Sequence, residues 1–232
     1  MTYVVSDIHG QYEKYLKMLQ KINFTDDDEL YVLGDVIDRG EHPVKLLLDM
    51  SMRGNVFPIL GNHEMIALSV LRKLCVEITD ENADSQVGLD DIKALTMWQM
   101  DGGDTTLAEF KTIDNDTKLS LIEYLEDFSP YEELTVHGRN YLLVHGGIPL
   151  SKVDVPLEEQ VLGELLTECP DYTVRYFKGK YLVTGHTPTL NIGREYDGRI
   201  YIKNGHIAID CGAGFDRPLG CVRLDDHAEF YV

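Results

Sequence analysis

The segment TYVVSDIHG (residues 2–10) joins an apolar run to a polar loop that ends in glycine. The apolar residues before Ser6 are typical of a buried strand, and Asp7 and His9 follow where that strand should end. Residues 11–22 then place apolar side chains at helical spacing. Taken alone, the Asp-x-His pair is compatible with a metal site, a turn or chance, so the rest of the chain has to decide between them.

The same order of strand, polar loop and helix recurs twice before residue 75. Strand-like residues 29–33 and 55–60 run into the loops GDVIDRG and GNHE, and helix-like residues 42–52 and 64–74 follow. Repeated units of this kind predict a layered α/β core. Ligands of open α/β sheets bind at the edge where strands run into such loops, so we expect a site there.

The second half of the chain returns to strands after an acidic interruption. Residues 75–125 contain 12 Asp and Glu against 3 Lys, a net charge of −9, and are predicted to form a mainly helical insertion in which Trp98 packs. Asn204-Gly205 between apolar runs is a strong hairpin signal, and residues 137–139 give a weaker one. We therefore expect one domain over residues 1–232, with residues 75–125 as a cap-like insertion.

Bulk composition narrows the classes of partner. The chain has 21 Lys and Arg against 40 Asp and Glu, a net charge of −19, which argues against a nucleic-acid partner. No run of about 18 apolar residues occurs, so we expect no membrane partner. The start of the chain lacks the pattern of a signal peptide, and the four cysteines include no C-x-x-C pair. These features predict a cytoplasmic protein with reduced thiols and leave its oligomeric state open.

Five polar loops that follow apolar runs carry the chemistry. They are Asp7-x-His9, Gly34–Gly40 (GDVIDRG), Gly61–Glu64 (GNHE), His145–Gly147 (HGG) and Gly185–Thr187 (GHT). Their carboxylate, amide and imidazole donors suit divalent transition metals such as manganese, iron or zinc. Each motif alone is a weak signal, but all five in this order, each at a strand end, indicate one shared site.

On these motifs the chain resembles the metallophosphoesterase (calcineurin-like) superfamily. Within it, the closest likeness is to the branch of PPP-type serine/threonine protein phosphatases and symmetrical diadenosine tetraphosphate hydrolases. The final motif lacks the second histidine of the common G-H-x-H pattern, because Pro188 follows Thr187, and this favours the PPP-like branch, as does Arg39. The resemblance implies an α/β fold: a four-layer αββα sandwich of two mixed sheets flanked by helices, with a mainly helical acidic insertion.

The resemblance also implies two divalent metal ions, with manganese as the first choice and iron or zinc as alternatives. A carboxylate between the two cations is physically needed because they repel each other, and paired ions of this kind lie about 3.5–4 Å apart. The implied ligands are Asp7 and His9 for the first ion, Asp35 as the bridge, and Asn62, His145 and His186 for the second ion.

Further roles follow from the same resemblance. His63 would be the general acid that protonates the leaving oxygen, and Asp38 would orient its ring. Arg39, with its planar guanidinium, would clamp phosphate oxygens together with Asn62. The family usually supplies a second clamping arginine between HGG and GHT, and the candidate there is Arg175, although its surroundings do not match the family pattern.

The sequence thus predicts a dinuclear metal-dependent phosphoric ester hydrolase. The first interpretation is a phosphomonoesterase of the serine/threonine protein phosphatase type, in which a metal-bridging hydroxide attacks phosphorus in line. Its substrate would be a phosphorylated protein or a small phosphorylated molecule. One alternative keeps the site and takes a symmetrical dinucleoside tetraphosphate, against which the acidic residues 75–125 would argue if they cover the site. The other is a catalytically inactive binding module, which the complete ligand set disfavours.

Overall fold

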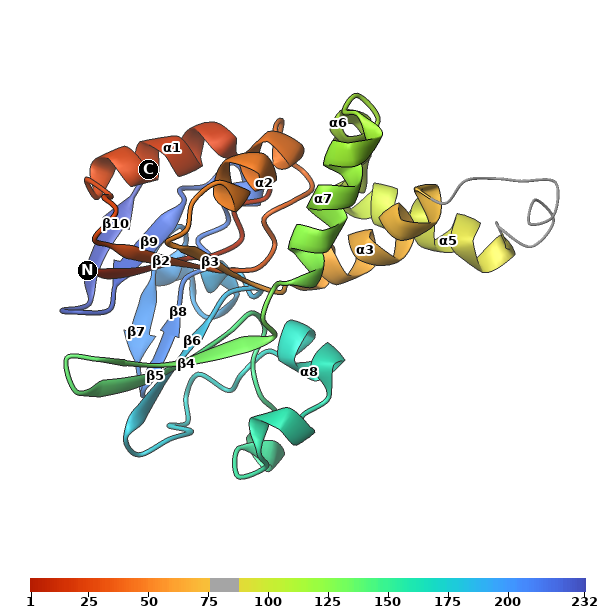
Figure 1. Ribbon diagram of the computed structural model, residues 1–232. Coiled ribbons are helices and arrows are strands. Elements are labelled where there is room, and N and C mark those ends of the chain that lie inside the picture. The colour runs from red at the N-terminus through yellow and green to blue at the C-terminus, as the bar shows by residue number, and fades with distance from the viewer. Residues whose placement is uncertain (76–87) are drawn as a thin grey trace, which may run out of the picture.

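The computed structural model describes residues 1–75 and 88–232, which form two five-stranded sheets packed face to face (Figure 1). The first sheet has the order β10-β9-β1-β2-β3, and the second has the order β4-β5-β6-β8-β7. Both are mixed sheets, as predicted. The strands of the first sheet are β1 (Thr2–Val5), β2 (Glu29–Leu33), β3 (Val56–Ile59), β9 (Gly220–Arg223) and β10 (Ala228–Tyr231).

The first sheet is built from the three predicted strand–loop–helix units. Strands β1, β2 and β3 are parallel neighbours, and β9 pairs with β1 in the antiparallel direction. The helices α1 (Tyr12–Lys21), α2 (Pro43–Ser51) and α3 (Asn62–Leu74) follow these strands in turn. Helix α3 begins two residues earlier than the sequence pattern indicates, so that Asn62 and His63 lie in its first turn.

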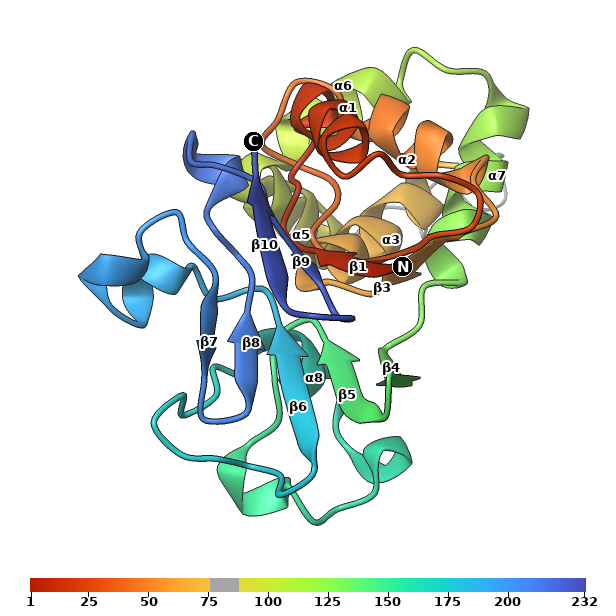
Figure 2. The same ribbon diagram turned by 90° about the vertical axis from the view of Figure 1, so that its left-hand side faces the viewer.

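The second sheet consists of β4 (Tyr131–Val136), β5 (Arg139–Val144), β6 (Lys180–Thr184), β7 (Tyr201–Lys203) and β8 (His206–Ala208). Strands β5, β6 and β8 are parallel, and Figure 2 shows their carboxyl ends directed toward the first sheet. The two predicted hairpins form the antiparallel pairs β4–β5 and β7–β8. The outer face of this sheet is covered by the short helix α8 (Leu162–Thr167) and the 3₁₀ turns Leu150–Lys152 and Leu157–Glu159. Beside β7 and β8, Tyr172 and Tyr196 pack on the same face.

Alternation along the strands divides the core. In β1, Val4 faces the second sheet, whereas Tyr3 and Val5 pack against the helices on the other face. Val4 and Leu33 meet residues of the second sheet such as Val183, and all three side chains are buried. Because the central strands are apolar on both faces, their polar residues are confined to the ends, where the predicted motifs lie.

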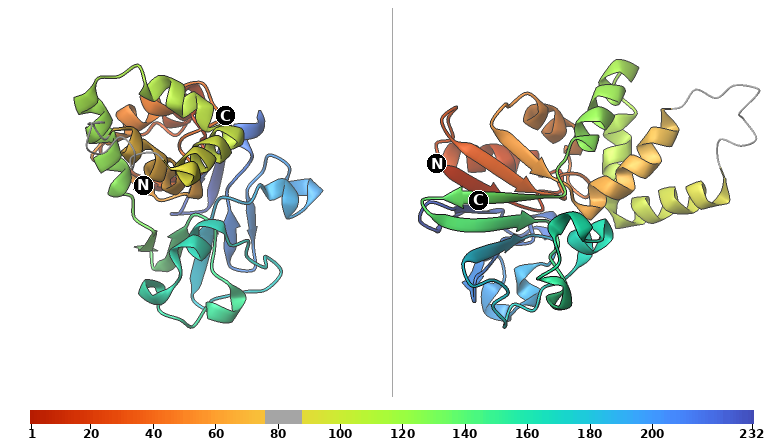
Figure 3. Two further views of the ribbon diagram at one scale, coloured as in Figure 1. Left: turned by 90° about the vertical axis from the view of Figure 1, so that its right-hand side faces the viewer. Right: turned by 60° about the horizontal axis from the view of Figure 1, so that its bottom comes forward.

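The insertion is helical, as predicted. Its described part contains α5 (Leu89–Trp98), a π-helical turn (Gln99–Gly103), α6 (Asp104–Phe110) and α7 (Asn115–Glu126). The stretch 76–87 of the predicted insertion lies outside the described residues. Figure 3 shows α3 and α5 running side by side away from the sheets. Three further 3₁₀ turns are Thr189–Asn191, Arg194–Tyr196 and Ala213–Phe215. In the described ranges, we find no helix with the length and apolar character needed to cross a membrane.

Candidate metal centre

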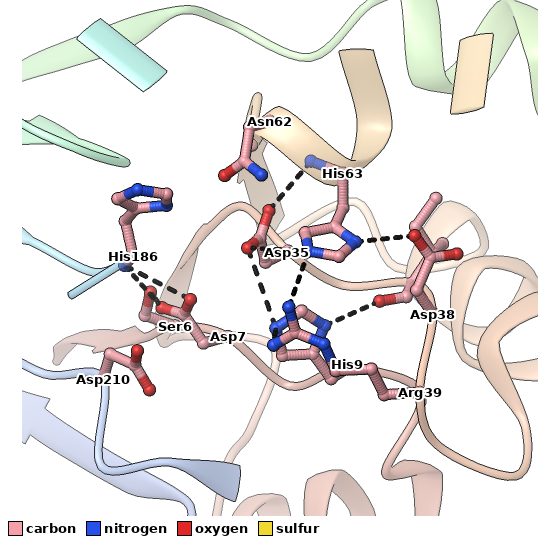
Figure 4. Close-up of polar contacts among 12 residues, drawn as sticks. Ser6, Asp7, His9, Asp35, Asp38, Arg39, Asn62, His63, His186 and Asp210 are labelled. Carbon is pink, nitrogen blue, oxygen red and sulfur yellow. Dashed lines mark hydrogen bonds and ion pairs between the residues drawn. The ribbon is translucent and has the colours of Figure 1, made fainter. Parts of the chain in front are cut away.

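The edge where the carboxyl ends of both sheets meet brings the six predicted ligand residues together. Figure 4 shows side chains from both sheets pointing toward one another around Asp35. The backbone N–H of His186 donates to the carboxylate of Asp7 at 3.0 Å, although the two residues are 179 positions apart. The contributing segments follow β1 (Asp7 and His9), β2 (Asp35), β3 (Asn62), β5 (His145) and β6 (His186).

Asp35 occupies the centre of this group. Its Oδ1 lies 3.2 Å from Nε2 of His145, and its Oδ2 lies 3.7 Å from Nε2 of His9. Burial alone would raise the pKa of Asp35, but the charge and hydrogen bond of His145 hold that pKa well below its ordinary value. An ionised carboxylate with a histidine on either side is the arrangement that a bridging ligand requires.

Backbone carbonyls orient the rings of the two flanking histidines so that Nε2 of each is available to a metal ion. Nδ1 of His9 donates to the carbonyl of Ile37 at 2.9 Å, and Nδ1 of His145 donates to the carbonyl of Leu33 at 2.6 Å. Each Nε2 therefore faces Asp35, as in metal sites where an outer hydrogen bond orients the imidazole. Burial would lower the pKa of His145, but Asp35 raises it to about 10, so metal would have to displace a tightly held proton.

The donor atoms form two clusters that share Asp35, and within each cluster they lie within 4.8 Å of one another. One consists of Asp35, His145 and His186, and it matches the predicted second ion, with Oδ1 of Asn62 at 3.0 Å from Nε2 of His145. The other consists of His9, Asp35 and His63. In this cluster His63, and not the expected Asp7, accompanies His9 and Asp35. The buried nitrogen and oxygen donors of the two clusters fit a pair of transition metals.

Two buried acids of the site were missed in the sequence. Glu64 accepts backbone N–H groups from Asp35 and Val36 at 2.8 Å, and it thereby fixes the loop after β2. Asp210 accepts the N–H of Gly212 at 2.9 Å and lies beside Asp7. Burial, followed by the charge of Asp35, raises the pKa of Glu64 to about 7, and burial raises that of Asp210 to about 6. Glu64 belongs to the motif GNHE and Asp210 to the stretch IDCGA, so the sequence did contain a signal for each. Bound cations would balance the negative charge of the two carboxylates.

The predicted pair of His63 and Asp38 is present and buried. Oδ2 of Asp38 lies 2.6 Å from Nδ1 of His63, and it also accepts the indole N–H of Trp98 at 2.8 Å. Thr106 donates its hydroxyl to the other carboxylate oxygen at 2.6 Å. Burial lowers the pKa of His63, but the hydrogen bond to Asp38 and the charges of Asp35 and Asp38 together outweigh burial and raise that pKa above its ordinary value. Trp98 therefore does more than pack the insertion, because it helps to orient the candidate acid through Asp38.

Arg39 reaches the same centre from the loop after β2. Its Nη1 lies 2.8 Å from Nε2 of His9, and its Nη2 lies 3.0 Å from Nε2 of His63. The guanidinium also packs on the ring of Phe215, 4.7 Å from the ring centroid, and donates to Oδ1 of Asp101 at 3.0 Å. Neither Asp101 nor Phe215 was predicted to belong to the site.

Arg175, the other predicted phosphate clamp, is not brought to the site. It is exposed, and its guanidinium packs against Gly205 in the turn between β7 and β8. That turn lies at the end of the second sheet opposite to His186. The segment before β6 runs along the far end of the sheet, so Arg39 alone of the two arginines faces the candidate ligands.

Backbone strain is concentrated at this edge. Among the described residues, eleven other than glycine have positive φ, and six of them are predicted site residues. Side chains other than glycine rarely occupy this region, and such outliers gather at functional sites. The six are Asp7 (φ 52°), His9 (47°), Asp35 (50°), Asp38 (70°), Arg39 (65°) and His186 (59°).

Comparison with known proteins places this geometry in a family. Residues 2–207 match the calcineurin-like phosphoesterase family. The chain belongs to that family. Calcineurin-like phosphoesterases are a class of metal-dependent phosphoric ester hydrolases, so the match confirms the predicted superfamily and enzyme class. The family uses divalent metals, and the two clusters around Asp35 are their candidate ligands.

Curated relatives of this phosphoesterase include symmetrical bis(5'-nucleosyl)-tetraphosphatases. The one from Wigglesworthia glossinidia brevipalpis is 34% identical over 98 residues, which cover 41% of this chain and 36% of the relative. The one from Salmonella enteritidis PT4 is 38% identical over 71 residues, which cover 30% of this chain and 25% of the relative. The matched part thus spans about a third or less of these relatives.

Solved structures confirm the fold of this phosphoesterase. A putative diadenosine tetraphosphatase superposes with a TM-score of 0.69 at 16% identity, covering 100% of this chain and 92% of the other. A protein serine/threonine phosphatase from Saccharomyces cerevisiae gives a TM-score of 0.58 at 15% identity, covering 100% and 78%. At such identities the likeness extends to the predicted sandwich of two sheets and not to the substrate.

Proposed function

We propose that this calcineurin-like phosphoesterase hydrolyses symmetrical dinucleoside tetraphosphates. The observation that carries the proposal is the sequence similarity to symmetrical bis(5'-nucleosyl)-tetraphosphatases, at 34% identity for one of them. Serine/threonine protein phosphatase, the first interpretation of the sequence, is supported by a likeness in fold alone. An exposed aromatic ring, Phe215, also lies beside Arg39 and offers a face on which a nucleobase can stack.

We assign two divalent ions to the site, with manganese as first choice and with the ligands expected from the sequence. When bound, these ions neutralise phosphoryl oxygens and activate the attacking water. The chain itself contributes Arg39, which holds phosphoryl oxygens, and Asn62, whose amide reaches the second cluster. His63 protonates the leaving oxygen from Nε2, because Nδ1 is engaged by Asp38. A cytoplasmic location is part of the same proposal and is consistent with four free cysteines.

The candidate general acid, His63, favours a second function, that of a phosphomonoesterase acting on phosphoserine or phosphothreonine. The leaving group of an alkyl phosphate is a strongly basic alkoxide, which needs a proton far more than a nucleoside diphosphate does. The buried pair of His63 and Asp38 supplies that proton, and the indole N–H of Trp98 orients Asp38 by donating to its carboxylate. Both candidates use the same site, and they differ in what lies beyond the reacting phosphorus.

Product analysis with added Mn²⁺ separates the two candidates. Diadenosine tetraphosphate and a phosphoserine peptide are incubated with the protein, and nucleotides and free phosphate are quantified by chromatography. Release of two ADP from the dinucleotide at a higher kcat/KM than phosphate from the peptide is the expected result. Release of AMP and ATP, or faster release of phosphate from the peptide, would overturn the proposal. Asp35→Asn serves as the inactive control, because Asp35 lies in both donor clusters.

A further inference from the structure

Asp101 places a carboxylate between the candidate phosphate clamp and the candidate acid. Its Oδ1 accepts from Nη2 of Arg39 at 3.0 Å, and its Oδ2 lies 3.5 Å from Nε2 of His63. The side chain is 53% exposed, so it faces the mouth of the site rather than the core. A phosphoryl group that contacts Arg39 and His63 together has to lie beside this negative charge.

The backbone fixes Asp101 in that position. The carbonyl of the next residue, Gly102, accepts the N–H of Arg39 at 2.9 Å. Gly102 has φ +102°, and a Cβ there would lie 2.6 Å from Cγ of Arg39, so only glycine permits the close approach. Gly103 in turn packs on the ring of Trp98. The turn that carries Asp101 is therefore fixed by Arg39 through Gly102 and by Trp98 through Gly103.

Few positive side chains surround Asp101, so its carboxylate has a large effect on the charge that an incoming phosphoryl group meets. Among the described residues, Arg39 is the one arginine or lysine in contact with His9 or His63. Asp101 pairs with that arginine. The carboxylate of Asp35 also lies 3.8 Å from Nε2 of His63, and the carboxylate of Asp38 contacts Nδ1 on the other side of the ring. The chain itself therefore offers an incoming phosphoryl group little net positive charge beyond what metal ions would bring.

We propose that Asp101 makes the enzyme select phosphoryl groups that carry one negative charge over those that carry two. Diesters and the internal phosphoryl groups of a polyphosphate chain belong to the first class. Terminal phosphomonoesters belong to the second, because their second pKa is about 6. This inference rests on the proposed hydrolytic site and names the class of phosphoryl group that the site takes. One unit of charge at about 4 Å in water changes an equilibrium about fivefold.

Two aryl substrates with the same leaving group test the selection. We expect Asp101→Asn to raise the ratio of kcat/KM for 4-nitrophenyl phosphate to kcat/KM for bis(4-nitrophenyl) phosphate about fivefold at pH 8 with Mn²⁺. Asp101→Glu keeps the charge and should retain the original ratio. Asp104→Asn is the matched control, since Asp104 is an exposed acid three residues away, and its ratio should change less than about twofold.

Binding supplies a readout that does not depend on turnover. Titration calorimetry on the manganese-loaded protein at pH 8 should show that Asp101→Asn binds inorganic phosphate, mainly a dianion, about 25-fold more tightly, and dimethyl phosphate, a monoanion, about fivefold more tightly. Equal changes for both anions, or equal changes in kcat/KM for both aryl substrates, would overturn the selection. If the ratio shifts while diadenosine tetraphosphate is not hydrolysed, the proposed substrate fails and the role of Asp101 stands.

Discussion

The floor of the site and its rim are built differently. On the floor, the side chains of Asp35 and His145 are 4% and 0% exposed, and several backbone groups fix their surroundings. On the rim, Asp101 and Phe215 are 53% and 52% exposed and meet at the guanidinium of Arg39. From this difference we infer that short loops at strand ends determine the chemistry, whereas segments outside these loops determine which molecules reach it.

The floor should be the more sensitive of the two regions, and Asp35→Asn tests it most severely. We expect kcat for 4-nitrophenyl phosphate with Mn²⁺ to fall by about a thousandfold, because the residue lies in both donor clusters. Bound metal, measured by elemental analysis, should fall as well. Asp49 lies on α2 and pairs with Arg53, and Asp49→Asn should leave both values nearly unchanged. Undiminished hydrolysis in Asp35→Asn would show that the floor is not the catalytic centre.

Next in size is the loss of the acid. His63→Asn should lower kcat for phosphoserine about a hundredfold or more, and for 4-nitrophenyl phosphate less than about tenfold. The reason is that nitrophenolate is a stable leaving group, whereas the serine alkoxide needs the proton that Nε2 would donate. Parallel kinetics on the two substrates measure the difference. Equal losses would point to His63 as a metal ligand beside His9 and Asp35, where the structure also allows it.

Asp38→Asn probes the support of that acid and should cost about tenfold in kcat. Burial lowers the pKa of His63, and the hydrogen bond to Asp38, with the charges of Asp35 and Asp38, raises it above the ordinary value. A group that acts as an acid loses activity as pH rises through its pKa. Removing the carboxylate lowers that pKa, so the alkaline limb of the pH profile of kcat should move to lower pH. A limb that stays in place would exclude His63 as the titrating acid.

A smaller effect is expected from Trp98→Phe, which keeps a ring and removes the N–H that Asp38 accepts. A buried carboxylate that loses a donor should destabilise the protein by about 2 kcal/mol, measured by urea denaturation. Thr106→Val removes another donor to Asp38 and should act similarly, while Thr106→Ser keeps the hydroxyl and should not. Unchanged stability in both variants would mean that the insertion does not support the floor.

The smallest effect belongs to the rim. Phe215→Leu removes the aromatic face under Arg39, a contact worth about 0.5–1 kcal/mol at an exposed site. KM for diadenosine tetraphosphate should rise about threefold or more, and KM for 4-nitrophenyl phosphate should rise less, since it has no nucleobase to stack. Phe57→Leu, a change of an exposed ring on β3, is the matched control. If KM rose equally for both substrates, the rim would not contribute to substrate selection.

Local patterns were sufficient to place the loops of the floor at one edge, whereas the ligand roles came from the family resemblance. Asp7 and Asp35 could be placed because each follows an apolar strand, and parallel strands bring their carboxyl ends to one edge. The hairpin at Asn204-Gly205 formed as expected, since that dipeptide tolerates positive φ at both positions. The start of α3 was placed two residues late, because the loop motif GNHE also supplies the first helical turn.

The rest depends on contacts between distant segments. Trp98 reaches Asp38 across 60 positions of sequence, and no periodicity records such a pairing. Arg175 was a candidate only because it lies between two motifs, and the path of its loop along the far end of the second sheet could not be inferred from composition. The motifs also could not indicate the substrate, because the branch that they resemble contains both protein phosphatases and dinucleotide hydrolases.

The run of left-handed residues along the floor has a consequence for engineering. Each such residue would gain roughly 1 kcal/mol of relief if glycine replaced it, because glycine has no Cβ to clash. A search guided only by thermal robustness would therefore drift toward glycine at Asp7, His9 and His186 and erase the ligand set. Heat resistance should instead be sought in remote parts of the molecule, such as the thinly covered outer face of the second sheet.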